Sequence, residues 1–279
     1  MRMAVLGAGT MGHGIAQVAA LADADVTLRD IDENALQRGL AGIRKSLDKA
    51  VEKTKVTRAQ ADEALARVRV VVPLDEAVRG ADFVVEAVPE KLELKRRVLA
   101  DVVQHVGPTC VLATNTSSLS IAAIAEGLPH PERVIGMHFF NPVPVMKLVE
   151  VVRGPRTSDE VTARVVALAQ SMGKEPIVVR DSPGFATSRL GIIMGLEAIR
   201  MLEEGVASAE DIDKAMTLGY NHPVGPLRLT DLVGLDVRLA IAEYLTREIG
   251  PRFEPPALLR QMVAAGKTGQ KAGEGFYKW

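Results

Sequence analysis

Short apolar runs alternate with helically patterned segments over the first two thirds of the chain. Such runs are typical of parallel strands covered on both faces, and apolar positions recurring every three or four residues are typical of amphipathic helices. The pattern predicts strands at 3–7, 26–29, 68–72, 82–88, 109–114, 146–152 and 176–179, and one that ends at 138–139. It predicts helices at 12–21, 34–51, 57–67, 92–106, 119–125 and 159–172. This alternation indicates an α/β fold with a largely parallel sheet.

The pattern changes at residues 181–184, where Asp-Ser-Pro-Gly interrupts the chain and no strand signal follows. The later residues predict helices at 186–204, 208–216, 229–249 and 256–264. We therefore expect two domains, an α/β domain over residues 1–182 and an all-helical domain over residues 183–279. The helical domain is small to stand alone, so we expect it to pack on the first domain and on a partner subunit.

The first predicted strand leads into a glycine-rich loop at residues 7–12, which opens the first helix. Gly7 allows a tight turn, Gly9 lets the backbone approach a pyrophosphate at the helix N-terminus, and Gly12 allows close packing of helix on strand. The second strand ends at Asp30, whose carboxylate can bind the adenosine ribose of a dinucleotide. This spacing predicts a Rossmann-type dinucleotide-binding domain. Its expected cofactor contacts are Gly7, Ala8, Gly9, Thr10, Met11, Gly12 and Asp30.

The segment at residues 136–152 carries a candidate catalytic pair. It predicts two short strands joined by a corner at 141–144, because two closely spaced prolines require an extended, sharply turned connection. Antiparallel pairing would bring His138 and Glu150 side by side. A histidine oriented by a carboxylate is a common general base near neutral pH. A histidine beside apolar strands is more often structural, so the pair alone leaves both interpretations open.

Polar residues follow two of the apolar strands, at 86–90 and at 115–118. Open α/β sheets bind ligands beyond the carboxyl ends of their strands, so both segments are candidates for a ligand cleft. Ser117 and Ser118 have a second interpretation, because one of them can cap the helix expected at 119–125. The helices at 34–51 and 57–67 are rich in charge, and from composition alone we expect a solvated hairpin.

The composition of the 279 residues, 47% hydrophobic and 25% charged, is that of an ordinary globular protein. A net charge of −1 gives no electrostatic footprint for nucleic acid or an acidic membrane surface. No apolar run is long enough to span a bilayer, and the chain starts in a strand rather than in a signal peptide. The single cysteine, Cys110, lies in an apolar run, so we expect a buried, inert thiol and a cytoplasmic protein. No metal site is predicted.

Several collinear motifs resemble the L-3-hydroxyacyl-CoA dehydrogenase family, in its 3-hydroxybutyryl-CoA dehydrogenase type. They are GAGTMG at 7–12, TNTSSLS at 114–120, GMHFFNPVPVMKLVEVV at 136–152, DSPGF at 181–185 and GEGFYKW at 273–279. The resemblance implies NAD-dependent, reversible oxidation of an (S)-3-hydroxyacyl-CoA to the 3-ketoacyl-CoA, a reaction of fatty acid β-oxidation. It also implies a homodimer joined through the helical domains.

The resemblance also implies roles for individual residues. His138 is the general base on the 3-hydroxyl group, Glu150 orients it, and Ser117 contacts the substrate oxygen. Ser46 and Lys53 match positions that contact CoA, which overrules the solvated interpretation of their helix. The remaining positions that match the cofactor cleft are Ile31, Ala87, Val88, Glu90, Lys95, Asn115, Asn141 and Lys271, together with Ser117.

One departure from the family pattern affects the substrate site. The family has asparagine where this chain has Ser188, in the segment GFATSRLG. A serine hydroxyl also donates a hydrogen bond but is shorter, so we expect Ser188 to reach the substrate oxygen through a water or after a small backbone shift. Arg189 is expected to be either a surface salt-bridge partner or a contact to a CoA phosphate.

Two other functions are compatible with the sequence. A dehydrogenase of a free hydroxy acid, such as a sugar acid or a carnitine-like substrate, would not need Ser46 and Lys53. A nucleotide-sensing or assembly protein would keep the fold without turnover, and only the change at Ser188 supports it. Asp30 predicts NAD rather than NADP, because its carboxylate would repel a 2′-phosphate. Arg29 is expected to point to the opposite face of the strand.

Overall fold

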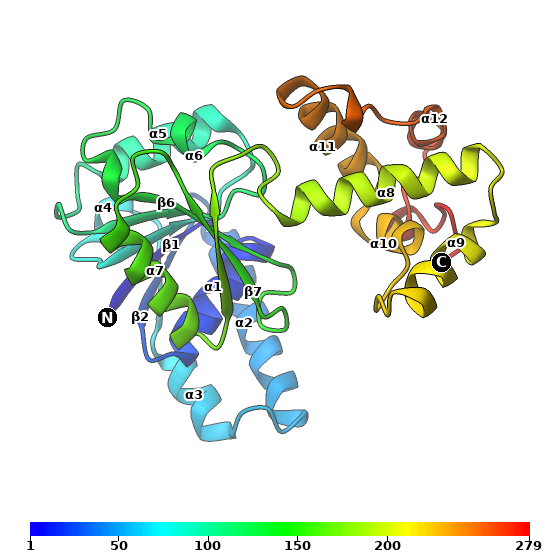
Figure 1. The fold of residues 1–279 in the computed structure, drawn as a ribbon. Coiled ribbons are helices and arrows are strands. Elements are labelled where there is room, and N and C mark those ends of the chain that lie inside the picture. Colours follow the sequence, from blue (N-terminus) through cyan, green and yellow to red (C-terminus); the bar gives the residue numbers. More distant parts are fainter. The chain divides into compact units, whose positions relative to one another are not determined.

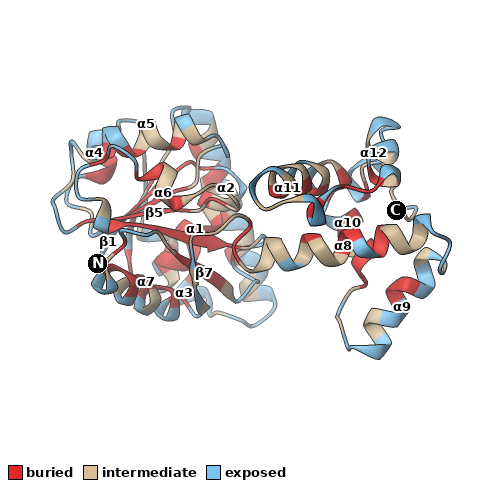
Figure 2. Cartoon of the chain, turned by 45° about the horizontal axis from the view of Figure 1, so that its top comes forward, coloured by how far each residue is buried: buried red, intermediate tan, exposed pale blue.

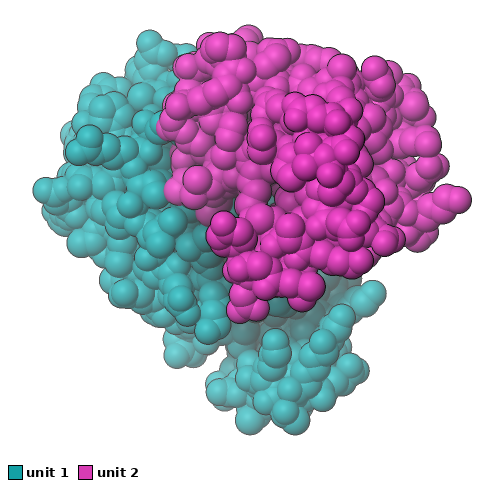
Figure 3. All heavy atoms as spheres, turned by 45° about the vertical axis from the view of Figure 1, so that its right-hand side comes forward, with its two compact units in different colours: residues 1–182 teal, residues 183–279 magenta.

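The computed structural model describes residues 1–279. The chain divides into two compact units, Met1–Ser182 and Pro183–Trp279, which Figure 3 distinguishes by colour. The first unit contains the sheet, and the second consists of helices, short turns and isolated bridges. No helix in the chain combines the length and the apolar character needed to cross a membrane.

The first unit is built on an eight-stranded sheet in the order β3-β2-β1-β4-β5-β6-β7-β8 (Figure 1). Its strands are β1 (Arg2–Leu6), β2 (Asp25–Arg29), β3 (Val68–Val71), β4 (Phe83–Glu86), β5 (Val111–Thr114), β6 (Val134–Phe139), β7 (Leu148–Arg153) and β8 (Glu175–Arg180). Neighbours are parallel from β3 to β6, whereas β7 is antiparallel to β6 and parallel to β8. The strand order reverses between β1 and β4, which is where open α/β sheets bind ligands.

Helices cover the sheet of the first unit (Figure 2). They are α1 (Thr10–Leu21), α2 (Glu33–Glu52), α3 (Arg58–Ala66), α4 (Leu74–Val78), α5 (Leu92–Val102), α6 (Ile121–Ile124) and α7 (Asp159–Ser171). Helices α1 and α7 bury apolar side chains such as Ile15 and Val165 in one core cluster with the strands. Strands β4 and β5 are completely buried, as expected for parallel strands covered on both faces. The predicted Rossmann-type α/β fold is therefore confirmed.

The second unit is helical, as predicted. Its helices are α8 (Thr187–Glu203), α9 (Ala209–Gly219), α10 (Pro226–Val233), α11 (Leu235–Glu248) and α12 (Ala257–Ala264). Their apolar sides share a core that includes Ile199, Leu227 and Leu245. Asp231, which is 1% exposed, anchors the C-terminal segment because its carboxylate accepts from two backbone amides and from the indole N–H of Trp279.

The structure corrects the expectation of one helix over 229–249. Two helices, α10 and α11, occupy this region and meet at Gly234, whose φ of 102° is incompatible with a continuous helix. Helix α10 also begins earlier, at Pro226, where proline suits the first helical position. The short helix α4 was not predicted, because its five residues give too little periodicity to recognise.

Candidate active site

The glycine-rich loop between β1 and α1 leaves its backbone open to a ligand. A Cβ on Gly7, whose φ is 102°, would lie 2.6 Å from the carbonyl oxygen of Ala87, and one on Gly12 would lie 1.7 Å from that of Gly7. Both positions therefore require glycine. A Cβ on Gly9 would meet nothing within 4 Å, so the N-terminus of α1 is accessible to a phosphate group.

A cleft of about 510 Å³ lies beside this loop, and Asp30 is held at its wall directly after β2. The carboxylate of Asp30 accepts from the amide of Ala8 at 2.7 Å and from that of Ile31 at 2.8 Å. The lining residues are Gly7, Gly9, Thr10, Met11, Arg29, Asp30, Ile31, Ala87, Val88, Pro89, Leu94 and Val98. Much of the predicted cofactor set thus shares one cleft, with a ribose-binding carboxylate and an open phosphate position that fit a dinucleotide.

Arg29 also lines this cleft, and the expectation that its side chain points to the opposite face from Asp30 stays a prediction. Its Nε donates to the carbonyl oxygen of Val72 at 3.0 Å, and the residue contributes to the lining. The lining residues Pro89, Leu94 and Val98 were missed because apolar side chains carry no signal for a cleft in sequence.

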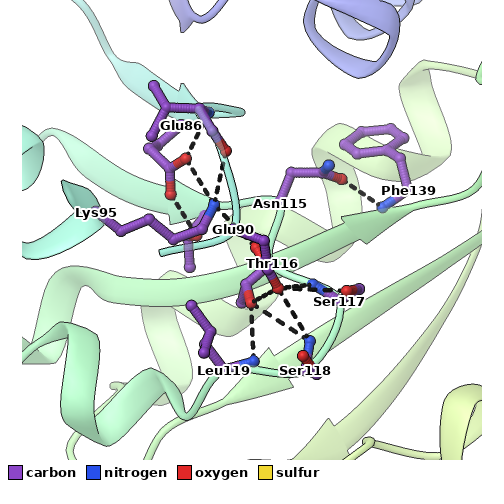
Figure 4. A network of polar contacts seen from close by, with 11 residues as sticks. Glu86, Glu90, Lys95, Asn115, Thr116, Ser117, Ser118, Leu119 and Phe139 are labelled. Carbon is purple, nitrogen blue, oxygen red and sulfur yellow. Dashed lines mark hydrogen bonds and ion pairs between the residues drawn. The ribbon is translucent and has the colours of Figure 1, made fainter. Parts of the chain in front are cut away.

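A buried ion-pair network lies beside the cleft, at the ends of β4 and β5 (Figure 4). Lys95, only 1% exposed, comes from α5 and places its Nζ 2.8 Å from Glu86 Oε1 and 3.2 Å from Glu90 Oε2. Glu86 is completely buried and also accepts from Thr114 Oγ1 at 2.6 Å and from the amide of Val88 at 2.7 Å. Glu86 begins the segment 86–90 that the sequence marked as a candidate for a ligand cleft, but no individual role was predicted for it.

Glu90 connects this network to the loop that carries Ser117. Its Oε1 accepts from Thr116 Oγ1 at 2.6 Å, from the amide of Ser117 at 2.8 Å and from Ser117 Oγ at 3.3 Å. Burial raises the pKa of Glu90, but the Lys95 ammonium and the bonds from Thr116 and Ser117 outweigh it, so the pKa lies below the usual carboxyl value. The loop that carries Ser117 is therefore hydrogen-bonded to the Glu90 carboxylate, which is charged near neutral pH.

The helix cap after this loop is Ser120, so the expectation that Ser117 or Ser118 caps it is wrong. Ser120 Oγ accepts from the amide of Ala123 at 3.2 Å at the start of α6. Thr116 Oγ1 holds the preceding turn by accepting from the amide of Leu119 at 2.9 Å. The N-cap lies three residues later than the earliest serine because α6 begins only at Ile121.

His138 and Glu150 are paired across β6 and β7, as the sequence predicted. The antiparallel register sets them directly opposite, and His138 Nδ1 lies 2.8 Å from Glu150 Oε2. His138 is 7% exposed and Glu150 is completely buried. The ring of Phe140 lies 4.5 Å from that of His138, at a tilt of 48°. On the other side of β6, Asn115 Oδ1 accepts from the amide of Phe139 at 2.8 Å, which joins the end of β5 to the same strand.

The corner between β6 and β7 is held from inside by Lys174, a residue that sequence reasoning missed. Its Nζ donates to the carbonyl oxygens of Val143 at 2.5 Å and Met146 at 2.9 Å. Burial lowers the pKa of this lysine. The corner carries Asn141, and the peptide bond between Asn141 and Pro142 is cis. Lys174 therefore fixes the segment on which the predicted cofactor contact Asn141 sits.

The remaining predicted residues lie outside this cluster. Ser46 is half-buried on α2 and Lys53 is exposed at its C-terminal end, so both lie in the charged hairpin of the first unit. In the second unit, Ser188 lies in the first turn of α8. Lys271 places its Nζ 2.6 Å from Asp236 Oδ2 and thereby lowers the pKa of that carboxyl.

The other chemically reactive groups are inert or dispersed. Cys110 is buried, and burial raises its pKa to about 11, which confirms the expectation of an unreactive thiol. No group of three or more His, Cys, Asp or Glu residues is arranged to hold a metal ion. The chemistry of the first unit therefore rests on the cleft, the network of Figure 4 and the pair of His138 and Glu150.

Comparison with known proteins agrees with this geometry. The probable 3-hydroxybutyryl-CoA dehydrogenase of Deinococcus radiodurans is 46% identical over 280 residues, covering 100% of both chains. The 3-hydroxyadipyl-CoA dehydrogenase of Escherichia coli is 43% identical over 99% of this chain and 58% of its own length. The crystal structure of (S)-3-hydroxybutyryl-CoA dehydrogenase from Ralstonia eutropha matches with a TM-score of 0.96 at 46% identity, covering 100% of this chain and 98% of that one.

Two family descriptions together account for nearly the whole chain. Residues 2–182 match the NAD binding domain of 3-hydroxyacyl-CoA dehydrogenase, and residues 184–279 match its C-terminal domain. The glycine-rich loop and Asp30 provide the features that an NAD-binding domain requires. The chain therefore belongs to the 3-hydroxyacyl-CoA dehydrogenase family of NAD-dependent oxidoreductases.

Proposed function

We propose that this protein catalyses the reversible, NAD-dependent oxidation of (S)-3-hydroxyacyl-CoA thioesters, with 3-hydroxybutyryl-CoA as a substrate and His138 as general base. The observation that carries the proposal is the 2.8 Å contact between His138 Nδ1 and Glu150 Oε2, in a buried pair next to the nucleotide-binding strands. Relatives in Deinococcus radiodurans and Ralstonia eutropha that bear the name 3-hydroxybutyryl-CoA dehydrogenase support the choice of substrate. The reaction is the oxidation step of fatty acid β-oxidation.

His138 and Glu150 act as a unit in this mechanism. Glu150 accepts the Nδ1–H of His138, so the tautomer with an unprotonated Nε2 is favoured and that nitrogen can take the 3-hydroxyl proton. The ring becomes an imidazolium, and the buried carboxylate beside it stabilises the new charge. The proton leaves the 3-hydroxyl oxygen and the hydride leaves the adjoining C3. Removing the proton therefore raises the electron density on the oxygen, which helps to expel the hydride from C3.

The residues at the strand ends position the cofactor and the substrate oxygen. A bound NAD would supply the acceptor for the hydride on C3 of the substrate. Asp30 holds the adenosine ribose, and the open amides after Gly9 hold the pyrophosphate. Ser117 Oγ lies 3.3 Å from Glu90 Oε1, and in the proposed complex this hydroxyl donates to the substrate oxygen. Lys95 and Asn115 hold the strand ends on which these groups depend.

The CoA group and the second unit complete the proposal. Ser46 and Lys53 contact CoA, and Lys53 supplies a positive charge for a phosphate. Ser188 contributes to the substrate-oxygen site and Lys271 to the cofactor site. The second unit also joins two copies into a homodimer. Its exposed apolar side chains support this role, since Leu218 is 82% exposed and Tyr220 76% exposed.

A steady-state assay with acetoacetyl-CoA and NADH tests the proposal. We expect turnover by the wild type, and a fall in kcat of about 10² to 10⁴ in His138→Gln with NADH binding retained. His105→Gln is the matched control because His105 is exposed in the first unit. Near-normal turnover in His138→Gln would remove this residue from the mechanism. Turnover of free 3-hydroxy acids in place of the thioesters would identify a hydroxy acid dehydrogenase instead.

A further inference from the structure

Arg238 is a buried cation without an anion. It lies on α11 in the second unit and is only 7% exposed. Its Nε is completely buried and has no hydrogen-bond partner. Burial lowers the pKa of Arg238 to about 10, and no neighbouring carboxylate offsets this effect. Arginine is rarely buried in proteins unless it is paired, because removing a guanidinium from water is costly.

Two glycines of α8 make room for this guanidinium. Arg238 Nη1 lies 3.4 Å from the position that a Cβ on Gly191 would take and 3.9 Å from that on Gly195. Any branched or long side chain at either glycine would occupy the space beside the cation. Glycine destabilises the interior of a helix relative to alanine, so two glycines within one helix indicate a packing reason. Gly191 leaves the room that Arg238 Nη1 occupies, whereas the atom nearest to a Cβ on Gly195 would be Thr230 Oγ1 at 3.3 Å.

The guanidinium lies along the helix face that carries Ser188. Residues 188, 191 and 195 are three and seven positions apart and therefore share one face of α8. At 1.5 Å per residue, Gly191 and Gly195 lie roughly 5 Å and 10 Å along the axis from Ser188. If Ser188 contacts the 3-oxygen of the substrate, Arg238 is within reach of groups a few carbon atoms away from it.

The chemistry of the substrate determines which group this is. Within roughly 10 Å of the 3-oxygen, an acyl-CoA has the neutral thioester and the acyl chain, whereas the phosphates of CoA lie beyond the long pantetheine arm. A neutral oxygen does not balance the positive charge of a buried guanidinium. A carboxylate balances this charge and accepts two parallel hydrogen bonds from the guanidinium. In the acyl chain, the three carbon–carbon bonds from C3 to C6 span roughly 4 Å. This length is about one helical turn, which is also the separation of Ser188 and Gly191 along α8.

We propose that Arg238 binds a carboxylate at the far end of the acyl chain, so that the enzyme accepts 3-hydroxyacyl-CoA thioesters of dicarboxylic acids. This inference rests on the proposed function, because it places the 3-oxygen at Ser188. A carboxylate of a partner subunit is a poorer candidate. Only 7% of Arg238 is exposed in a single chain and its Nε is completely buried, and a thin acyl chain reaches such a position more readily than a folded surface does.

The test compares two thioesters of equal length, 3-hydroxyadipyl-CoA and 3-hydroxyhexanoyl-CoA, which differ by a terminal carboxylate against a methyl group. The quantity measured is the ratio of their kcat/KM values with NAD. We expect Arg238→Met to lower the ratio of adipyl to hexanoyl thioester by about 10- to 100-fold, the usual effect of losing a charged hydrogen bond. Arg247→Met, on the exposed side of the same helix, should leave the ratio at its wild-type value.

A second variant and a binding measurement guard against misfolding. Gly191→Val leaves Arg238 in place but fills the space beside it, so it should lower the same ratio. Adipate should raise the melting temperature of the wild type and not that of Arg238→Met. Without ligand, Arg238→Met should be at least as stable as the wild type, because it removes an unpaired buried charge.

Each alternative gives a distinct result. An unchanged substrate ratio in Arg238→Met, or a fall in its dimer affinity, would overturn the inference, the latter by assigning the guanidinium to the subunit interface. Turnover of 3-hydroxybutyryl-CoA without any preference for the adipyl thioester in the wild type would also overturn it while leaving the proposed function intact. Absence of turnover with every thioester would instead refute the proposed function, and this inference with it.

Discussion

His138 Nδ1 lies 2.8 Å from Glu150 Oε2 because the antiparallel register of β6 and β7 sets these two residues directly opposite. Each strand contributes one polar side chain to an otherwise apolar surrounding, and the backbone ladder fixes their separation. The pair therefore does not depend on a flexible loop. The corner that joins the two strands is itself anchored by Lys174, which holds two of its carbonyl groups.

Replacing Glu150 by glutamine keeps the hydrogen bond but removes the charge. We expect Glu150→Gln to lower kcat by about 10²-fold, because the imidazolium that forms at His138 loses its buried counter-charge. NADH binding, followed by fluorescence, should be unchanged. Glu175→Gln on the neighbouring strand β8 is the control, since its exposed carboxylate lies 3.4 Å from Lys147 at the surface. Equal losses in both variants would show that the effect comes from the fold and not from the pair.

The buried ion pair of Lys95 and Glu86 should be essential for stability. Lys95→Met leaves the Glu86 carboxylate buried without its cation, and breaking such a pair costs about 3–5 kcal/mol. Urea unfolding, followed by circular dichroism, measures this loss. The double variant Lys95→Met with Glu86→Gln removes both charges and should recover much of it. No recovery in the double variant would mean that the lysine stabilises the fold through its packing alone.

Glu90 should make part of the stability dependent on pH. Its pKa in the folded protein lies below the usual value, because Lys95 and the loop hydrogen bonds outweigh the effect of burial. Its stabilising contribution is therefore complete above the unfolded carboxyl pKa of about 4.3 and is lost as the pH falls through the lower folded pKa. The difference in unfolding free energy between wild type and Glu90→Gln should shrink as the pH falls from about 5 to about 3. A difference that stays constant over this interval would contradict the assignment.

The sequence was most informative where local chemistry and strand geometry agree. The spacing of Gly7, Gly9, Gly12 and Asp30 is tied to one backbone geometry, so the nucleotide-binding strands could be predicted with their order. The pairing of His138 with Glu150 could be anticipated because the proline corner predicts two adjoining strands, each with one polar side chain in apolar surroundings. These features are encoded within a few residues of one another.

The features that the sequence did not reveal depend on contacts between distant segments. Lys95 belongs to a helix with ordinary polar periodicity, and only the approach of β4 shows that it is buried against Glu86. Gly234 resembles a tolerated helical glycine until its positive φ is seen. The burial of Arg238 depends on the room that Gly191 provides on α8, which is visible only in three dimensions.

Asp30 should control the choice between the two nicotinamide cofactors. Its carboxylate lies in the cleft where the adenosine ribose binds, and Arg29 lines the same cleft. Asp30→Asn keeps an acceptor for only one of the two amides that the carboxylate binds, those of Ala8 and Ile31, but removes the repulsion of a 2′-phosphate. We expect the ratio of kcat/KM for NADH to that for NADPH to fall by about 10- to 100-fold. Asp32→Asn, at the exposed N-cap of α2, is the control, and a wild type that prefers NADPH would refute this role of Asp30.

Substitutions at Ser188 test whether the substrate site of this chain still accepts the asparagine of the family pattern. It lies in the first turn of α8, on the face shared with Gly191, and a serine there is shorter than the asparagine that the family has. We expect Ser188→Asn to retain turnover of acetoacetyl-CoA within about 10-fold, because the amide restores a direct hydrogen bond to the substrate oxygen. Ser188→Ala should lose more than Ser188→Asn in kcat, since alanine offers no donor. Complete loss in Ser188→Asn would instead show that the pocket has been reshaped around the smaller hydroxyl, with the space beside Gly191 no longer able to accept an amide.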